Sequence, residues 1–504
     1  MRAVVNKNRY KKVLLFFIMF VCMTLLLQKP IYADQDRSKD RSYVYTTDME
    51  DVPIPDPYQF QRALTLMDRN GTKMANPIDM FVTEEEQIYV LDSDTGTIEI
   101  YDKELSPVKI IDKFFYEGQE SPLKKPEGLF VTREGVIYIA DTENNRIIAS
   151  DQEGNISSVI KKPKNIVGSS IDQFLPVKLV VDSINRVSVI ARNINMGFMQ
   201  FDSNGSFMGY TGAPSVKLTA MDRIWRLFSS QAQRAQMSLF VPTEYNNLKI
   251  DEKGFLWGTI SSISAKEAGK AATGDTSISP VKKINSTGKD VLKRNGILPP
   301  IGDFNFVHDP SGSPSKIIDV ALGPGNVYSL LDSNDGKIFT YNGEGDLLYV
   351  FGRIGNCKGN FERPAAIDYL GNRLVVLDNA LSQLVLFDLT DYGNKIMEAT
   401  ILYADGKYSL TYDKWKEVAE SNTNFQHAFI GLGNAKMNEG KYREAMSYFE
   451  YSNDIGEYSE AKEMLRKEQA RHVFPYVFIG LIGICLFFTI RSIVNKAKRY
   501  ARGL

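Results

Sequence analysis

The sequence contains few of the residues on which disulfide frameworks, zinc centres and catalytic triads depend. Only three cysteines and three histidines occur among 504 residues. Cys22 and Cys485 fall in apolar segments, which leaves Cys357 without a partner for an internal disulfide. Two of the histidines lie outside the repeat region described below, which argues against a His-rich zinc site or a Ser-His-Asp triad. The histidines are His308, His427 and His472.

An excess of charge of one sign is also absent. Sixty Lys and Arg against 61 Asp and Glu leave a formal net charge of −1, so no basic field is available to attract nucleic acid. The sequence shows neither a glycine-rich phosphate loop nor a nucleophile elbow of the hydrolase type. The hydrophobic share of 43% and the charged share of 24% are those of a globular protein, and the length allows more than one domain.

The N-terminus has the layout of a secretory signal. Basic residues precede an apolar run, Val13 to Leu27, and a small-residue cleavage site follows at Ala33. We therefore predict a signal peptide over residues 1–33 and a linker over residues 34–57. An uncleaved anchor is the alternative, and it would leave the following domain on the same side of the membrane.

A second apolar run, Val473 to Ile490, is uncharged and about long enough to cross a bilayer core. It predicts a transmembrane helix over 473–490 and a basic tail over 491–504. Because positive residues favour the cytoplasmic side, we expect a single-pass cell-membrane protein with its C-terminus in the cytoplasm and the rest outside. The basic residues after the run are Arg491, Lys496, Lys498, Arg499 and Arg502.

A β-hairpin pattern recurs along the chain. In its fullest form the strand Val136 to Ala140 ends at Asp141, whose carboxylate can accept backbone N–H groups in an Asx turn, and the next strand begins at Arg146. Repetition of this pattern indicates an array of propeller blades. The other strand ends of this kind are Asp92, Asp332 and Asp378.

Six inner-strand openings, each following proline or a polar turn, predict six blades. We therefore expect a mainly β protein with a six-bladed β-propeller over 58–392 and an α-helical C-terminal module. The last blade lacks one strand, and Tyr58 to Met67 alternates as a strand that would complete it and remove the exposed edges. The openings begin at Asn76, Lys125, Leu175, Asn246, Lys316 and Arg363.

Two insertions widen the spacing of the later blades. Leu218 to Met237 has apolar residues at helical spacing and predicts an amphipathic helix on the propeller rim. Ser261 to Pro280 is rich in Ser, Ala, Gly and Thr and has little to bury, so we expect a mobile loop.

The hairpins resemble NHL repeats, in which a strand ending in Asp is followed by Asn-x-Arg-Ile or a similar sequence. The match is fullest in the second blade and weakest in the third and fourth, where Arg192 and Gly258 stand in the region of the Asp. The resemblance implies an NHL-type β-propeller. The matching residues of the second blade are Asp141, Asn144 or Asn145, Arg146 and Ile147.

The tripeptide Gly-Lys-Tyr recurs after 34 residues, at 406–408 and 440–442, which is the tetratricopeptide period. The second unit resembles that family, because Gly433 permits a close approach of two helices and Ala445 lets the second helix pack against the first. We therefore predict two tetratricopeptide-like helical hairpins over 393–472.

Trp415 is expected in the core of the first helical hairpin, and Tyr458 to His472 is expected to form a capping helix. Because arrays of this type usually need at least three repeats, we expect support from the propeller or from an associated protein.

A resemblance to the six-bladed lactonases of the gluconolactonase family suggests an enzymatic alternative. Those proteins hold a divalent cation at the channel mouth, and the resemblance implies Glu127, Asn247 and Asp319 as metal ligands here. Oxygen ligands of this kind suit Ca²⁺. The other interpretation is that Glu127 and Asp319 are solvated turn residues, that Asn247 satisfies a blade turn, and that the protein has neither a cofactor nor catalytic residues.

The combination of modules favours a membrane-anchored binding protein over an enzyme. The propeller would recognise a small-molecule, carbohydrate or protein ligand, and the helical repeats would dock a membrane partner. Similar propeller-plus-repeat proteins occur at the surface of Gram-positive bacteria, some beside carbohydrate transport systems, which implies a link to carbohydrate uptake. The alternatives are a cation-dependent lactonase-like hydrolase acting at the channel mouth and a scaffold for envelope assembly.

Overall fold

Antiparallel β-sheets form the larger part of the structure, a computed structural model that describes residues 41–68, 70–163, 173–192, 194, 196–212, 245–261, 263–272, 279–296, 299–303 and 313–501. The predicted signal peptide, the start of the predicted linker and the predicted helix Leu218 to Met237 lie outside the described residues.

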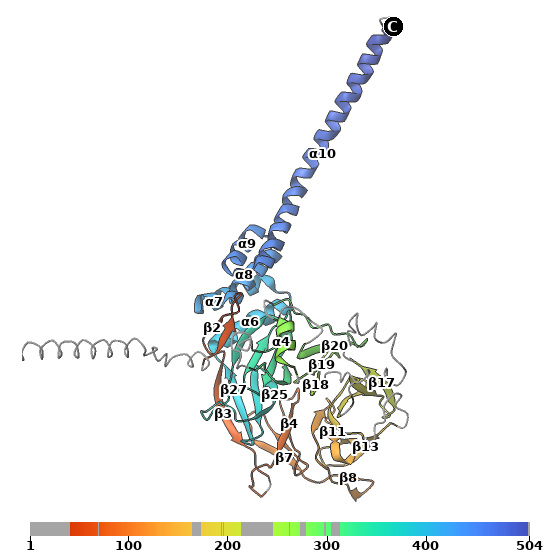
Figure 1. Cartoon of the computed structure of the whole chain (residues 1–504), viewed down its shortest axis with the longest axis vertical. Coiled ribbons are helices and arrows are strands. Elements are labelled where there is room, and N and C mark those ends of the chain that lie inside the picture. The colour runs from red at the N-terminus through yellow and green to blue at the C-terminus, as the bar shows by residue number, and fades with distance from the viewer. Residues whose placement is uncertain are drawn as a thin grey trace, which may run out of the picture. The chain divides into compact units, whose positions relative to one another are not determined.

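Six of the sheets are the blades of a β-propeller (Figure 1). Blade one contains β4 (Pro77–Val82), β5 (Ile88–Asp92), β6 (Thr97–Tyr101) and β7 (Pro107–Ile111). Blade two contains β10 (Gly128–Val131), β11 (Ile137–Asp141), β12 (Arg146–Ser150) and β13 (Ile156–Lys161). Blade three contains β14 (Pro176–Val181), β15 (Val187–Ala191), β16 (Phe198–Phe201) and β17 (Phe207–Thr211).

The remaining blades differ in their number of strands. The described part of blade four contains β18 (Asn247–Ile250), β19 (Leu256–Thr259) and β20 (Val281–Ile284). Blade five contains β21 (Ile317–Leu322), β22 (Tyr328–Asp332), β23 (Ile338–Tyr341) and β24 (Leu347–Phe351). Blade six contains β25 (Pro364–Leu370), β26 (Arg373–Asp378), β27 (Gln383–Leu389) and β3 (Tyr58–Thr65). A separate two-stranded hairpin is formed by β8 (Phe115–Tyr116) and β9 (Gln119–Glu120).

Buried aspartates hold the hairpins in register with the loops beside them. Asp141 accepts hydrogen bonds from the backbone N–H of Lys124 at 2.7 Å, from Asn144 Nδ2 at 2.8 Å and from Arg146 Nε at 2.7 Å. Its carboxylate therefore joins the turn after β11 to the loop before β10. The other three predicted strand ends, Asp92, Asp332 and Asp378, also accept backbone N–H groups from the loop before the inner strand, and all four are fully buried. The assignment to the NHL family stays a prediction.

The ring is closed, as predicted. The innermost strands β4, β10, β14, β18, β21 and β25 contact one another in that order, and β25 contacts β4. β3 pairs antiparallel with β27, from Tyr58 opposite Leu389 to Thr65 opposite Gln383. Figure 1 shows these two strands, far apart in the sequence, side by side in blade six. Strand β3, which precedes blade one in the sequence, thus supplies the edge that the last blade lacks.

Part of the segment expected to be a linker is folded. β1 (Tyr43–Tyr45) and β2 (Asp51–Pro53) form a hairpin that extends blade five beyond β24. The structure therefore corrects the expectation of a linker over 34–57 from Tyr43 onward. All three residues of β1 are buried, so both faces of this strand are packed against other parts of the protein. A solvent-exposed linker would not be packed in this way.

The expected loop Ser261 to Pro280 contains a helix, α4 (Ala265–Ala272). Ser264 and Glu267 form a capping box, with the Glu267 carboxylate accepting from the Ser264 backbone N–H at 2.9 Å. Ala268 and Ala271 are buried, so the alanines that suggested a segment with little to bury instead allow close packing.

Five helices follow the propeller in the described residues: α6 (Asp391–Ala404), α7 (Tyr408–Ser421), α8 (Gln426–Asn438), α9 (Tyr442–Tyr451) and α10 (Ile455–Ala501). Each packs against the next. Gly433 lies where an added Cβ would come within 2.4 Å of the Phe449 ring, so the close approach expected at this glycine is present. The tetratricopeptide assignment stays a prediction.

The predicted capping helix and transmembrane helix are parts of one continuous helix, α10, which includes Pro475 (Figure 1). The boundary expected near residue 473 is therefore a change in composition and not a break in the helix. Within the described residues, one helix, α10, is long and apolar enough to cross a membrane by length and composition. Which side each end faces stays a prediction.

The helices share a hydrophobic core with the propeller. Ile396 and Met397 of α6 and Trp415 of α7 pack in one cluster with Val327 and Ile367 of blades five and six. Space at the contact is tight, because a Cβ on Gly393 would lie 2.0 Å from the carbonyl oxygen of Pro57. The propeller thus provides the support that a short helical array was expected to need.

Candidate functional site

Polar side chains of the inner strands face one another around the propeller axis. We call them the channel cluster: Asp79 on β4, Lys178 on β14, Asn247 and Lys249 on β18, Asp319 on β21 and Asp368 on β25. Lys178 Nζ lies 2.5 Å from Asp79 Oδ1, and Lys249 Nζ lies 2.8 Å from Asp368 Oδ2. The ion pairs are largely shielded from solvent, with side-chain exposures between 9% and 18%.

The structure brings two of the three predicted metal ligands together. Asn247 Nδ2 donates a hydrogen bond to Asp319 Oδ1. Asp319 also accepts from the backbone N–H groups of Val320 at 2.7 Å and Ile367 at 2.8 Å. Glu127, directly before β10, instead receives two hydrogen bonds from Arg192 Nη2, at 2.5 and 2.7 Å.

Burial raises the pKa of Asp319 to about 6, against the opposing attraction of Lys249 and Lys178. Burial alone would lower the pKa of Lys249, but the carboxylates of Asp368 and Asp319 raise it above its ordinary value. Lys249 is therefore a permanent cation beside these two carboxylates at neutral pH.

The predicted calcium site does not match this arrangement well. The Asp319 oxygens already accept three hydrogen bonds, and Glu127 is neutralised by Arg192. In the part of the chain that the structure describes, no three His, Cys, Asp or Glu residues are grouped so that they could hold a metal ion. Calcium binding by Glu127, Asn247 and Asp319 stays a prediction, and it would require these existing partners to be displaced.

A cleft of about 800 Å³ lies between the propeller and the helical module. This volume is in the range of small-molecule sites, about 300 to 1,000 Å³. One wall is built from the turns of blades four and five, and the other from α6, α7 and α8. The lining includes five aromatic side chains, which are Phe255, Trp257, Tyr403, Tyr408 and Trp415.

On the propeller wall, two of the three lysines, Lys283 and Lys293, are paired with carboxylates. Lys283 Nζ lies 2.8 Å from Asp251 Oδ2 and 4.9 Å from the centre of the Trp257 ring. Lys293 Nζ lies 2.6 Å from Glu344 Oε1. These two lysines therefore carry little uncompensated charge beside the aromatic surface of this wall.

On the helical wall, Tyr403 and Tyr408 form an edge-to-face pair with ring centres 5.4 Å apart. Burial raises the pKa of Tyr403 to about 12, so its hydroxyl is neutral and able to donate a hydrogen bond. Asn434 of α8 and Asn326 of blade five face the same cleft, and their side-chain amides make no hydrogen bond to other described residues. They are open donors and acceptors for a ligand.

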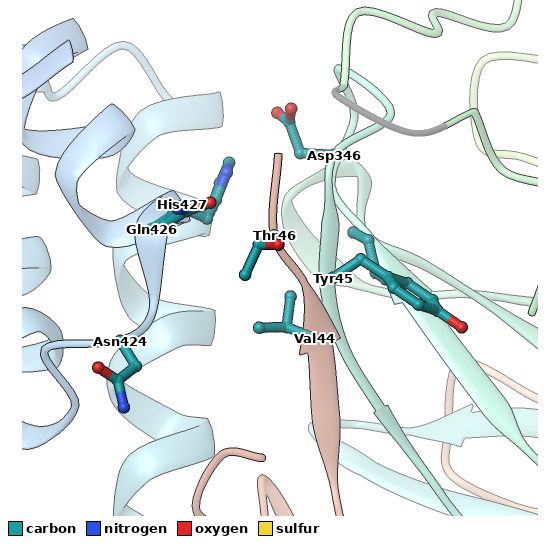
Figure 2. Close-up of a pocket in the computed structure, with 8 residues that line it drawn as sticks. Val44, Tyr45, Thr46, Asp346, Asn424, Gln426 and His427 are labelled. Carbon is teal, nitrogen blue, oxygen red and sulfur yellow. The ribbon is translucent and has the colours of Figure 1, made fainter. Parts of the chain in front are cut away.

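A second, much smaller cavity of about 30 Å³ lies where the N-terminal hairpin meets both modules. Figure 2 shows Val44 and Thr46 between the helices and blade five, with the Tyr45 ring directed into the propeller. The volume suits about two water molecules. Asp346 and His427 line this cavity and also the cleft, so the hairpin closes one end of the cleft.

Sequence reasoning did not find the cleft. Trp415 was expected only as helical core, and it is buried there, yet it also lines the cleft. The sequence around Trp257 gives no sign of a ligand site, because the helical residues that face it across the cleft lie more than 140 positions later in the chain. The recurring Gly-Lys-Tyr tripeptide does contain Tyr408, but its period indicates packing and not a ligand site.

No protein-family model and no curated protein matches the sequence. Virginiamycin B lyase from Staphylococcus aureus is similar in fold, with 12% identity over 66% of this chain and 100% of its own, and a TM-score of 0.40. A streptogramin B lyase has 13% identity over 64% of this chain and 85% of its own, with a TM-score of 0.37. A proposed gluconolactonase has 11% identity over 67% of this chain and 94% of its own, with a TM-score of 0.37. Similarity this distant concerns the fold and transfers no activity.

Proposed function

We propose that this protein is a membrane-anchored, extracytoplasmic binding protein and that the cleft between the propeller and the helical module holds its ligand. The observation that carries the proposal is the cleft itself, a cavity of about 800 Å³ with aromatic rings on both walls and unoccupied amide groups beside them. The propeller supplies one wall and the helices the other, so neither module alone forms the site.

The ligand class that fits best is a carbohydrate or another neutral, hydroxyl-rich molecule. A sugar ring has an apolar C–H face that packs on aromatic rings, and its hydroxyl groups both donate and accept hydrogen bonds. Phe255 and Tyr408 offer the first kind of contact, while Asn326 and Asn434 offer the second. Lys283 and Lys293 are already paired with carboxylates, which does not favour a strongly anionic ligand.

The same proposal gives a role to helix α10 and to the helical module. Helix α10 anchors the protein in the membrane, and the helical module docks a membrane partner, in keeping with a role in carbohydrate uptake.

Binding of a panel of sugars and oligosaccharides to the purified full-length protein tests the proposal. Tyr408→Ala should weaken binding of the best ligand about tenfold or more, because it removes an aromatic contact from the cleft. Tyr116→Ala is the matched control: both tyrosines are 37% exposed, but Tyr116 lies on β8 and does not line the cleft. Equal affinities of the two variants for a bound sugar would reject the cleft as its site.

A further inference from the structure

Three carboxylates of the channel cluster each link one blade to the next. Asp79 of β4 accepts the backbone N–H of Leu129 in β10 at 2.9 Å. Asp319 of β21 accepts the N–H of Ile367 in β25 at 2.8 Å, as described above. Asp368 of β25 accepts the N–H of Val82 in β4 at 3.3 Å, across the point where the ring closes. Each of these hydrogen bonds joins neighbouring inner strands.

The two lysines of the cluster behave differently, because they reach past a neighbouring strand. Lys178 lies on β14 and pairs with Asp79 on β4, although β10 stands between these strands in the ring. Lys249 lies on β18 and pairs with Asp368 on β25, although β21 stands between them. Lys249 Nζ also lies 5.7 Å from the centre of the Phe81 ring in blade one. Both side chains therefore extend across the interior of the ring.

The charges of the cluster nearly balance. The three carboxylates of Asp79, Asp319 and Asp368 face two ammonium groups, and Lys249 interacts with all three carboxylates. Buried carboxylates need such compensation, since an unpaired charge in this environment is costly. A divalent cation would supply the same two positive charges.

We infer that the ammonium groups of Lys178 and Lys249 stand in place of a divalent cation at the centre of this propeller. The ring is closed by internal ion pairs across the channel, and its stability does not depend on a metal ion. This inference is independent of the ligand proposed for the cleft. It also bears on the lactonase alternative, because the positive charges of Lys178 and Lys249 act on Asp319, one of the predicted ligands of a catalytic cation.

Thermal unfolding of the full-length protein with added Ca²⁺ or with a chelator is the first test. The natural sequence should unfold at the same temperature in both conditions. A rise with Ca²⁺, or a fall with the chelator, would overturn the inference. Lys249→Met should lower the midpoint by about 5 °C, since it leaves buried carboxylates without their counter-charge.

The Lys249→Met variant gives the second test. The substitution frees Asp368 Oδ2 and leaves the Asp319 carboxylate without the positive charge of Lys249, and carboxylate oxygens are the type that Ca²⁺ prefers, so Ca²⁺ should restore part of the lost midpoint. If Ca²⁺ does not change the unfolding midpoint of Lys249→Met, then the cation does not take the position of the lysine, and the inference is wrong.

Two further variants test the same inference if Lys249→Met folds poorly. The double variant Lys249→Met with Asp368→Asn removes both charges of one pair and should unfold above the single variant. The control Lys253→Met, an exposed lysine on the same blade, should leave the midpoint unchanged. A double variant no more stable than Lys249→Met would contradict the compensation argument.

Discussion

The buried aspartates at the strand ends offer a comparison within one molecule. Asp141 and Asp332 occupy the same place in blades two and five, and both are fully buried. Asp141 has an arginine partner, with Arg146 Nε 2.7 Å from its Oδ2. Asp332 Oδ2 has no hydrogen-bond partner within the described part of the chain. The two substitutions Asp141→Asn and Asp332→Asn should therefore have different costs.

The magnitudes follow from the partners. Asp141→Asn keeps the shape but removes the charge that faces Arg146, so a buried guanidinium loses its counter-charge, at a cost of about 3 kcal/mol. Burial raises the pKa of Asp332, so folding opposes the ionisation of this carboxyl. Asp332→Asn removes that penalty and should change the free energy of unfolding by less than about 1 kcal/mol.

Thermal unfolding at pH 7 measures the difference. We expect Asp141→Asn to lower the midpoint by about 4 to 8 °C and Asp332→Asn to change it by no more than about 2 °C. As the pH is lowered, the natural sequence should gain stability relative to Asp332→Asn, because the raised pKa of Asp332 lets the folded state bind a proton more readily than the unfolded chain. Equal losses at pH 7 would refute the argument that the arginine partner sets the cost.

Three further predictions concern closure, pH and helix packing. Leu66→Ala, at a buried position just after β3, should cost about 2 to 5 kcal/mol in unfolding free energy, whereas Leu410→Ala at an exposed position should cost almost nothing in the same denaturation assay. Burial, and to a smaller extent Asp454 and other acidic neighbours, raise the pKa of Glu457 to about 7. The folded state therefore loses stability as the pH rises from about 4.5 through 7 and Glu457 ionises. Glu457→Gln should therefore be more stable by about 1 kcal/mol at pH 8, after allowance for solvent screening, and equal to the natural sequence near pH 4 in unfolding titrations. Gly433→Ala should separate α8 from α9, seen as faster amide hydrogen exchange in both helices, and unchanged exchange would contradict the close packing against the Phe449 ring.

The propeller could be predicted because its signals are local and repeated. Asp92, Asp141, Asp332 and Asp378 each end a strand and bind the loop before the inner strand, so one hairpin pattern carries both the turn and its partner. The closing strand was predictable for a related reason, since a blade with three strands needs a fourth.

The errors arose where packing outweighed local composition. The hairpin beginning at Tyr43 was expected to be a linker, and only the two modules on either side of it account for its burial. Helix α4 was expected to be a loop because its small residues offered little to bury, yet Ser264 and Glu267 carried a capping signal that the composition hid.

The candidate site was the least predictable part. The predicted metal ligands Glu127, Asn247 and Asp319 were taken from a family resemblance. Arg192, Lys178 and Lys249 each pair with a carboxylate that lies on another blade than their own, which no local pattern reveals. The cleft depends on the docking of α6 to α8 on blades four and five, which no sequence spacing encodes. Long-range contacts of this kind become visible only once the modules are placed together.

Amide hydrogen exchange of the full-length protein, with and without a bound sugar, tests the cleft as ligand site most directly. We predict that protection appears in the turn Asn342–Asp346 and in residues 403–408, which line the two walls, and not in the inner strands β18, β21 and β25. Protection confined to the inner strands would place the ligand in the propeller channel and contradict the account.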